Sequence, residues 1–328
     1  MILAAALLMS FATEPDFAKI GRESLESLKA HYHLPGGLFS ELPGKKQPAF
    51  NWGVGVVLSA LNAAAQFDPA YKPELRRYAD AIQVYWNDGG YDVLPVPKDK
   101  DRYYDDNAWM VLALVETHAI LGDQKYLDRA EAAMKFVLSG EHPEGGIYWR
   151  ESDRASRNTC SNAPAAAALM ALYKVTKKPE YRAKASELYD WTEKTLSDPA
   201  DNLLWDNISI GGKVERTKWS YNTALMIRAG HDLGISQKDR LASARTRWFK
   251  NGSVNDPGRF AHLLMEAVLQ LDPQDKTVRD ALRTVWAARR DGLTPSHWGE
   301  LNVGKNPEIL DQASVTRVAF LLASLEKS

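Results

Sequence analysis

The chain has 328 residues, of which 45% are hydrophobic and 25% are charged, and its formal net charge is −1 at pH 7. These proportions are those of a globular protein, not of a disordered or fibrous chain, and such a small net charge gives no sign of a nucleic-acid or acidic-membrane partner. Cys160 is the single cysteine, which excludes an intrachain disulfide and a cysteine-based zinc site.

The N-terminal residues, 1–13, carry a short apolar run. It is typical of the remnant of a signal peptide, although no basic residue precedes it, and a plain apolar N-terminal segment is the alternative. The run is too short to span a bilayer, and no other stretch approaches about 18 apolar residues. We therefore expect no membrane-spanning segment and a single domain over residues 14–328. A signal peptide predicts a secreted or periplasmic protein, and the alternative leaves a cytoplasmic location open.

From residue 14 onward, apolar residues recur at helical spacing, and strand-like alternation is almost absent. The pattern predicts twelve helices, over residues 14–31, 51–66, 73–87, 106–121, 124–139, 160–175, 179–196, 219–233, 237–249, 257–271, 275–290 and 311–326. They follow one another as six consecutive pairs, which indicates a repeated helix-hairpin architecture.

The two members of each pair differ in character. The second member, such as the helix over 160–175, is apolar nearly all round and must be buried. The first member, such as the helix over 179–196, has one apolar stripe and one charged face. Six buried helices surrounded by six striped ones satisfy both patterns most simply. The sequence therefore predicts an all-α fold, an (α/α)6 barrel, which is a toroid of six helix hairpins with an inner and an outer ring.

The connections between helices differ in length according to their direction. Those from an inner helix to the next outer one are short, such as GDQ at 122–124, whereas most of those from an outer helix to the next inner one have about 20 residues. Compact domains usually keep loops of that length only for function. All the long connections leave the ring at the same end, so we expect the functional site on that face.

The clearest candidate on that face is the segment YYDDNAW at residues 103–109, at the start of the second inner helix. Asp105 and Asp106 can cap the helix, because aspartate bonds the free N–H groups of a helix N-terminus. They can also perform glycoside hydrolysis, which needs two carboxyl groups beside the scissile bond, about 5–5.5 Å apart when one is the nucleophile. Two such close carboxyls raise one pKa, which leaves one group ionised and the other a proton donor. Asp105 and Asp106 are therefore the candidate catalytic residues, with their roles still unassigned.

Aromatic residues and asparagines gather around the same long connections. An aromatic face can pack on the C–H face of a sugar while a tyrosine or tryptophan tip forms a hydrogen bond, although any single one can also simply pack beneath a loop. The asparagines open inner helices, as N-caps or as donors to sugar hydroxyls. The candidate substrate-binding residues are Trp52, Tyr104, Asn107, Tyr148, Trp149, Asn162, Trp219, Tyr221 and Asn222.

Five segments occur in the order of a known family: NWG at 51–53, YYDDNAW at 103–109, GGIYW at 145–149, NTCSNA at 158–163 and WSYN at 219–222. Together they resemble glycoside hydrolase family 76, the bacterial endo-α-1,6-mannanases and their fungal cell-wall relatives. The resemblance implies an (α/α)6 fold and a retaining mechanism, in which Asp105 is the nucleophile and Asp106 the general acid/base. Tyr148 departs from the tryptophan that the family often has at this place, which affects substrate contacts and leaves the aspartates intact.

The sequence thus predicts a retaining glycoside hydrolase that cleaves α-1,6-mannosidic linkages within mannan. A mannan transglycosylase of the same fold and a non-catalytic glycan-binding protein are the alternatives. The expected partner is an α-mannan polysaccharide or oligosaccharide, with no nucleic acid, and the protein is expected to act as a monomer. No cofactor or metal is expected, because the seven histidines show no metal-binding spacing.

Overall fold

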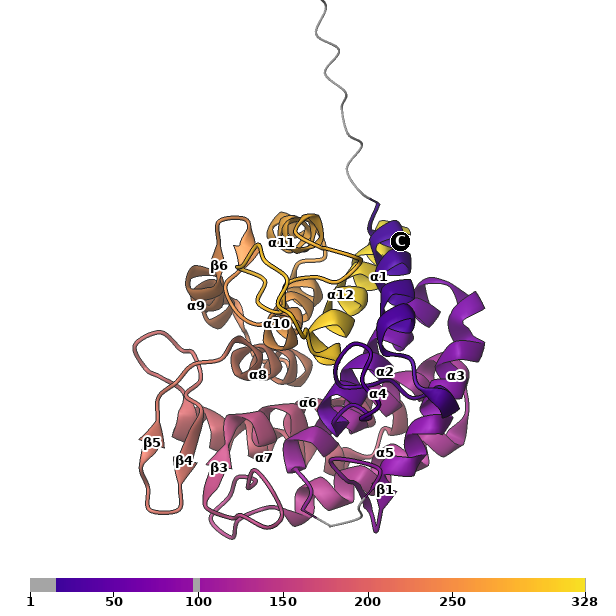
Figure 1. Cartoon of the computed structure of the whole chain (residues 1–328). Coiled ribbons are helices and arrows are strands. Elements are labelled where there is room, and N and C mark those ends of the chain that lie inside the picture. The colour runs from indigo at the N-terminus through magenta and orange to yellow at the C-terminus, as the bar shows by residue number, and fades with distance from the viewer. Residues whose placement is uncertain (1–15, 97–100, 328) are drawn as a thin grey trace, which may run out of the picture.

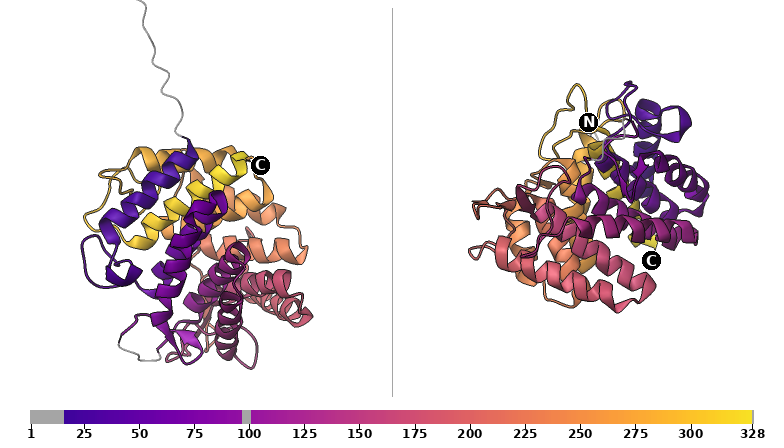
Figure 2. Two further views of the ribbon diagram at one scale, coloured as in Figure 1. Left: turned by 90° about the vertical axis from the view of Figure 1, so that its right-hand side faces the viewer. Right: turned by 90° about the horizontal axis from the view of Figure 1, so that it is seen from below.

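A computed structural model describes residues 16–96 and 101–327 of the chain, so the predicted signal-peptide remnant at 1–13 lies outside the described residues. The described ranges contain twelve α-helices, which alternate between an outer and an inner ring (Figures 1 and 2). The outer helices are α1 (Phe17–Tyr32), α3 (Lys72–Ala81), α5 (Gln124–Ser139), α7 (Pro179–Leu196), α9 (Lys238–Trp248) and α11 (Lys276–Ala287). The inner helices are α2 (Asn51–Phe67), α4 (Tyr104–Leu121), α6 (Thr159–Thr176), α8 (Ser220–Leu233), α10 (Gly258–Leu271) and α12 (Ile309–Lys327).

The inner helices form a closed ring. Each of α2, α4, α6, α8 and α10 packs on the next in that order, α10 packs on α12, and α12 packs back on α2. The outer helix α1 also packs on α12, so the first and last helices of the chain lie side by side (Figure 1). The predicted (α/α)6 barrel is confirmed.

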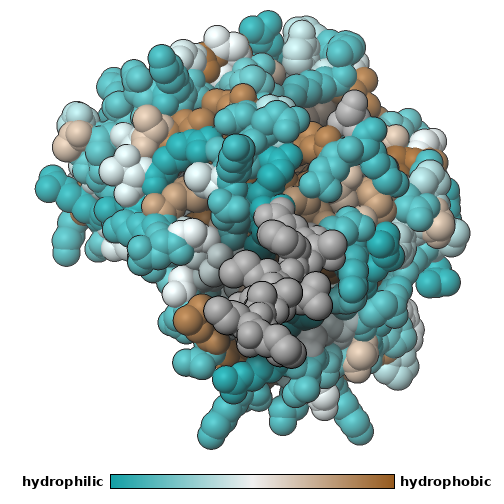
Figure 3. Space-filling view, turned by 90° about the horizontal axis from the view of Figure 1, so that it is seen from above, coloured by the Kyte–Doolittle hydropathy of each residue, from teal (hydrophilic) through white to brown (hydrophobic). Residues whose placement is uncertain are grey.

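Burial separates the two rings as the sequence pattern requires. In the inner helix α6, 13 of 18 residues are buried, whereas in the outer helix α7 only 5 of 18 are. The alanine-rich run of α6, residues 165–168, is fully enclosed by its neighbours because side chains this small let helices approach closely. The outer helices turn their charged faces to solvent, and hydrophobic residues form only scattered patches on the face seen in Figure 3.

The connections from inner to outer helices can be short because adjacent residues end one helix and cap the next. Helix α4 ends at Gly122, which adopts the left-handed conformation (φ 70°) and donates its N–H to the carbonyl oxygen of His118. The next residue, Asp123, caps α5 by accepting a hydrogen bond from the N–H of Lys125. Two residues therefore suffice to turn the chain through a helix hairpin.

The long connections contain short structure that the helical pattern does not predict. The 3₁₀ helices are η1 (Pro35–Gly37), η2 (Pro69–Tyr71) and η3 (Ile82–Tyr85), and only η2 lies in a short connection. The strands are β1 (Trp86–Asn87), β2 (Gly90–Tyr91), β3 (Ser156–Asn158), β4 (Asn207–Ser209), β5 (Val214–Glu215), β6 (Phe249–Lys250) and β7 (Ser253–Val254). All pairings are antiparallel, as the hairpins β1–β2 and β6–β7 and the sheet β3–β4–β5.

One predicted helix is shorter than expected. The helix predicted over 73–87 ends at Ala81, and the chain continues through η3 into the hairpin β1–β2. Asp88 and Gly89 have positive φ (43° and 88°), the conformation of a tight two-residue hairpin turn. Among the described residues, no helix has both the length and the apolar character that a bilayer span requires.

Candidate active site

A cavity of about 750 Å³ opens at the N-terminal ends of the inner helices, on the face that carries the long connections. This volume lies within the range of small-molecule binding sites, roughly 300–1,000 Å³. The lining residues are Phe50, Trp52, Val93, Tyr103, Asp105, Asp106, Trp149, Asp153, Ser156, Asn158, Cys160, Asp206, Asn207, Trp219, Tyr221 and Phe260. The structure therefore brings both predicted catalytic aspartates together in one cavity with four of the predicted substrate-binding residues, Trp52, Trp149, Trp219 and Tyr221.

Asp105 and Asp106 lie in the first turn of α4, which begins at Tyr104. The N-cap residue, Tyr103, makes no capping bond with its side chain. Asp105 Oδ1 accepts the N–H of Asp106 at 3.0 Å, and its Oδ2 accepts the indole N–H of Trp149 at 3.0 Å. The carboxyl of Asp106 makes no hydrogen bond with any residue that the structure describes, so it does not cap the helix.

Burial and mutual repulsion make Asp106 a weaker acid than Asp105. Burial raises the pKa of Asp105 to about 6, against the partial offset of its hydrogen bonds from Asp106 and Trp149. Burial raises the pKa of Asp106 well above its usual value, and repulsion from Asp105 raises it further. Asp105 is therefore the stronger acid of the pair, and Asp106 keeps its proton to higher pH. A nucleophile and a proton donor need this division.

An aromatic cluster lines the same cavity as these carboxyls. The rings of Tyr221 and Phe260 stack with centroids 4.5 Å apart and planes 15° apart. Trp52 stacks on the same phenyl ring at 5.6 Å, and Trp219 lies at 5.3 Å from it at a tilt of 47°. Such a surface suits the C–H face of a pyranose ring. Phe260 has no polar tip and escaped the sequence analysis, because it sits within an apolar helix beyond the shortest of the connections between an outer and an inner helix.

The sheet β3–β4–β5 supplies polar groups to the cavity wall. Ser156 and Asn158 come from β3, and Asn207 comes from the neighbouring strand β4. Asp206 lies directly before β4, where it accepts hydrogen bonds from the amides of Asn207 (2.8 Å) and Asn222 (3.4 Å). Burial raises the pKa of Asp206. Sequence analysis missed these residues, although Asp206 stands beside Trp205 in one of the long connections.

The predicted asparagines do not line the cavity. Asn107 and Asn162 are fully buried, and the side-chain amide of each forms hydrogen bonds with the backbone of the loop before its helix. Asn107 Oδ1 accepts the N–H of Tyr91 at 2.7 Å, and its Nδ2 donates to the carbonyl oxygen of the same residue at 3.0 Å. Asn162 binds the N–H and carbonyl oxygen of Ile147 in the same way. Both residues fasten the long loops to the inner helices, and substrate binding by them stays a prediction.

Two predicted tyrosines and the third asparagine are also held elsewhere. Tyr104 is buried in the core, where its ring stacks on Phe136 at 5.0 Å. Tyr148 is buried and packs edge-on against His142 at 5.5 Å. Asn222 is buried and reaches the cavity only through its bond to Asp206. None of the three lines the cavity, and their direct contact with substrate stays a prediction.

Comparisons with known proteins agree with this geometry. Residues 23–233 match the sequence profile of glycosyl hydrolase family 76. No curated protein matches the chain. A family 76 α-mannanase of Bacteroides thetaiotaomicron is 26% identical in sequence, with a TM-score of 0.90 over 96% of this chain and 97% of that one. A family 76 glycoside hydrolase from a bovine strain of the same species is 25% identical, with a TM-score of 0.86 over 96% of this chain and 79% of that one.

A third solved structure contains a bound oligosaccharide. It is an inactive variant of an α-1,6-mannanase from a Salegentibacter species, in which two consecutive aspartates are replaced by asparagine, in complex with α-1,6-mannotriose. It is 22% identical to this chain, with a TM-score of 0.81 over 94% of this chain and all of that one, a likeness that concerns the fold. Among the described residues, no group of three or more His, Cys, Asp or Glu side chains could hold a metal ion.

Proposed function

This chain belongs to glycosyl hydrolase family 76 and is a glycoside hydrolase, and on that premise we propose that it cleaves α-1,6-mannosidic linkages within mannan, with retention of anomeric configuration. The observation that carries the proposal is the pair of adjacent carboxyls, Asp105 and Asp106, held in one cavity, with the pKa of Asp106 raised by burial and by repulsion from Asp105. The substrate rests on the solved structures, which include α-mannanases and an α-1,6-mannanase bound to α-1,6-mannotriose.

The proposed reaction divides the work between the two aspartates. The ionised Asp105 attacks the anomeric carbon while Asp106 gives its proton to the glycosidic oxygen, so that the leaving sugar departs and a glycosyl-enzyme ester forms. Asp106 then takes a proton from water, and that water attacks the anomeric carbon and releases Asp105. Trp149 holds the Asp105 carboxylate in place through its indole N–H, at 3.0 Å. Because Asp106 has no hydrogen bond to a described residue, its proton is available to the substrate.

Cleavage within the chain, not only at its end, is part of the proposal. The cavity volume of about 750 Å³ exceeds what a single sugar needs. Trp149 bonds to Asp105 and has 39% of its surface exposed, and Trp219 packs on Phe260 in the aromatic cluster of the same cavity. Several aromatic surfaces in one cavity suit a polymer that extends beyond the cleaved linkage.

The proposal also covers the setting in which the enzyme acts. We infer a single catalytic domain over residues 14–328 that works as a monomer outside the cytoplasm, since a polysaccharide does not cross a membrane unaided. Light scattering on the purified chain tests the monomer, and fractionation of producing cells tests the location. A dimer in the first measurement, or recovery only from the cytoplasm in the second, contradicts these parts.

Product analysis on unbranched α-1,6-mannan tests the reaction. We expect Asp105→Asn and Asp106→Asn each to lower the hydrolysis rate by about 10²–10⁴-fold or more while the fold is kept. Asp153→Asn is the matched control, because that carboxyl also lines the cavity but pairs with Arg150 at the surface. Near-normal activity in either of the first two variants contradicts the assignment.

The same samples separate the alternatives. Proton NMR of the first products should show the α-anomer for retention, and the β-anomer would indicate inversion. Chromatography should show a range of oligosaccharides for internal cleavage, whereas release of mannose alone would indicate action at chain ends. Lengthened products with an added acceptor sugar would indicate transglycosylation. Calorimetric binding of mannan oligosaccharides without any shortened product would indicate a non-catalytic binding protein.

A further inference from the structure

A second cavity, of about 280 Å³, lies farther along the inner helices, away from the active site. Its wall comes from the middle and the C-terminal halves of inner helices, including Glu116 and Ala119 of α4 and Ala171 and Lys174 of α6. Trp109 forms the wall nearest the active site. Its ring also packs on Trp52 at 5.8 Å and on Tyr221 at 6.5 Å, both of which line the catalytic cavity. One indole therefore separates the two cavities.

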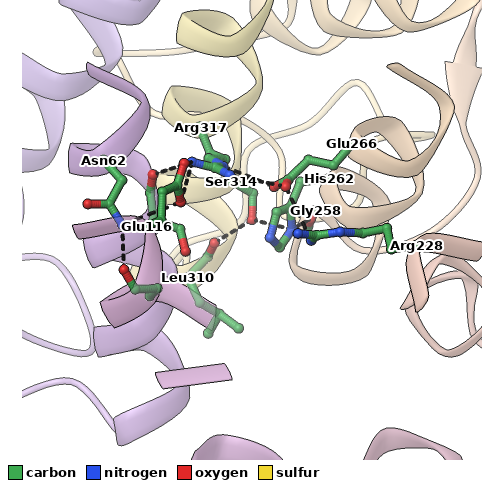
Figure 4. Close-up of polar contacts among 11 residues, drawn as sticks. Asn62, Glu116, Arg228, Gly258, His262, Glu266, Leu310, Ser314 and Arg317 are labelled. Carbon is green, nitrogen blue, oxygen red and sulfur yellow. Dashed lines mark hydrogen bonds and ion pairs between the residues drawn. The ribbon is translucent and has the colours of Figure 1, made fainter. Parts of the chain in front are cut away.

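An arginine at the wall of this second cavity joins four inner helices (Figure 4). Arg317 of α12 donates to both carboxylate oxygens of Glu116 at 2.8 and 3.0 Å and to the carbonyl oxygen of Ser59 at 2.9 Å. It also forms two bonds to Glu266 of α10, at 3.1 and 3.2 Å. Burial alone would raise the pKa of Glu266, but Arg317 and Arg228 outweigh it and lower that pKa to about 2. Glu266 is therefore ionised at neutral pH.

Such a cluster is a costly way to stabilise a barrel. Side chains of Arg317 and Glu266 are only 8% and 9% exposed, and a buried ion pair can often be replaced by apolar residues with no loss of stability. Here the charges border an open cavity, whereas a stabilising core would fill the space. Arg228 reaches into it with a single long hydrogen bond, of 3.4 Å, to Glu266 among the described residues. Most donors of that guanidinium are therefore free to bind something else.

A buried histidine adds an acceptor without a partner. His262 is 1% exposed and lines the cavity, and burial lowers its pKa to about 4, so its ring is neutral at pH 7. Its Nδ1 lies 3.0 Å from the carbonyl oxygen of Gly258 and 3.1 Å from the hydroxyl oxygen of Ser314 (Figure 4). A carbonyl oxygen only accepts, so Nδ1 carries the proton and Nε2 a lone pair. Nε2 has no hydrogen-bond partner within the described part of the chain.

These groups define the chemistry of an occupant. The Arg228 guanidinium requires acceptors, while His262 Nε2 and the carboxylates require donors, and a hydroxyl group is both. Arg317 and Arg228 balance Glu116 and Glu266 in charge, and Lys174 pairs with Asp232 at 2.6 Å, so neither a cation nor an anion is favoured over a neutral molecule. Trp109 offers an aromatic face of the kind on which sugar rings pack. The volume is just below the lower limit of drug-sized pockets, roughly 300 Å³, which suits one small ring.

We propose that this second cavity, lined by Trp109, Arg228, His262 and Glu266, is a binding site for a single free monosaccharide. It is separate from the catalytic cavity and does not depend on the proposed reaction, since binding can be measured in the absence of any cleavage. Because Trp109 touches residues of both cavities, an occupant is expected to alter the environment of this indole.

Calorimetric titration of the full chain with mannose, and with glycerol as a smaller polyol, tests the proposal. Binding of mannose with a dissociation constant of about 1 mM is expected, the strength usual for so small a ligand. Ala171→Phe should abolish this binding, because it fills the cavity without removing a charge. Trp219→Ala, which alters only the catalytic cavity, should retain it. Arg228→Ala should weaken it about tenfold, and it serves in place of Ala171→Phe if that variant does not fold.

The outcomes separate the two cavities. Mannose binding that is lost in Ala171→Phe and kept in Trp219→Ala supports the second site, as does quenching or enhancement of tryptophan fluorescence in the same pattern. Binding that survives Ala171→Phe, that keeps its full strength in Arg228→Ala, or that is lost only in Trp219→Ala places the sugar in the catalytic cavity and overturns the proposal. Absence of any binding to the unmodified chain overturns it as well. Equal affinity for glycerol would contradict a site shaped for a sugar ring.

Discussion

Replacement of Trp149 by phenylalanine isolates one hydrogen bond to the nucleophile. In the native protein the indole Nε1–H donates to Asp105 Oδ2 at 3.0 Å, and the neighbouring N–H of Asp106 donates to the other oxygen. Both bonds favour the ionised carboxylate and so oppose the rise in pKa that burial causes. Trp149→Phe keeps an aromatic ring beside the substrate but removes the indole donor. We therefore expect the pKa of Asp105 to rise further.

The size of this rise follows from the strength of the bond. A hydrogen bond to a charged group contributes about 1.5–3 kcal/mol. Because Trp149 is 39% exposed, water screens the interaction, and the lower end of that range applies. About 1.4 kcal/mol corresponds to one pKa unit, which moves the pKa of Asp105 from about 6 to about 7. The ionised fraction at pH 5.5 then falls from about 0.24 to about 0.03, an eightfold loss, whereas at pH 8 it falls by only about a tenth.

The assay is kcat/KM on α-1,6-mannan oligosaccharides measured from pH 4.5 to pH 8.5. We expect the acid limb of the profile for Trp149→Phe to shift upward by about one pH unit and to meet the native profile near pH 8. Trp219→Phe is the control, because that ring packs on Phe260 and has no bond to Asp105. It should change KM without moving the acid limb. A uniform loss for Trp149→Phe at every pH would refute the reasoning and leave Trp149 as a substrate contact only.

Three further changes test other parts of the structure. Burial raises the pKa of Asp106 above its unfolded value, so above about pH 4 the carboxyl ionises more readily in the unfolded chain and the folded state loses stability. Asp106→Asn should therefore raise the melting temperature at pH 7, with no gain at pH 4. Arg317→Met should lower the free energy of unfolding by about 3–5 kcal/mol in denaturant titrations, because it leaves the nearly buried carboxylate of Glu266 and the partly buried one of Glu116 without their main counter-charge. Lys174→Met at the exposed rim should cost under about 1 kcal/mol. Gly146 and Gly212 have similar positive φ, 80° and 82°, but a Cβ on Gly146 would lie 2.5 Å from the Trp191 ring, whereas one on Gly212 would meet open space. Gly146→Ala should therefore lower the free energy of unfolding by about 2–4 kcal/mol and Gly212→Ala by about 1 kcal/mol. Equal losses would refute the steric argument.

The helical architecture could be predicted because burial alone distinguishes the two rings. A helix such as α6, with alanine and leucine on every side, has no stable place except inside, and its striped neighbour α7 must cover it. The short strands could not be predicted from periodicity, since strands of two or three residues have no measurable period. Their turns did carry a signal: Asp88–Gly89 and Asn251–Gly252 are the residue pairs that tight hairpins prefer, and all four have positive φ.

The catalytic aspartates could be predicted from the sequence, but several other residues of the site could not, because their positions depend on the tertiary structure. Asp105 and Asp106 could be identified because the helix start that holds them is local in sequence. Tyr104 is adjacent to them, yet a helix turns each successive side chain by about 100°, which directs this ring into the core. Asp206 enters the cavity only because β4 pairs with β3, about 50 residues earlier in the chain. Such a pairing leaves no local mark in the sequence.

The position of Arg317 late in the chain has a consequence for biosynthesis. Its partners Ser59, Glu116 and Glu266 are translated well before it, so a nascent chain carries two carboxylates without their counter-charge. Helix hairpins can form on the ribosome from local contacts, but Arg317 can join the inner helices only after it has left the exit tunnel. Ribosome-bound chains stalled shortly after residue 317, still within the exit tunnel, should therefore be far more sensitive to protease than the released protein. Resistance of the stalled chains would show that the ring assembles without its last helix.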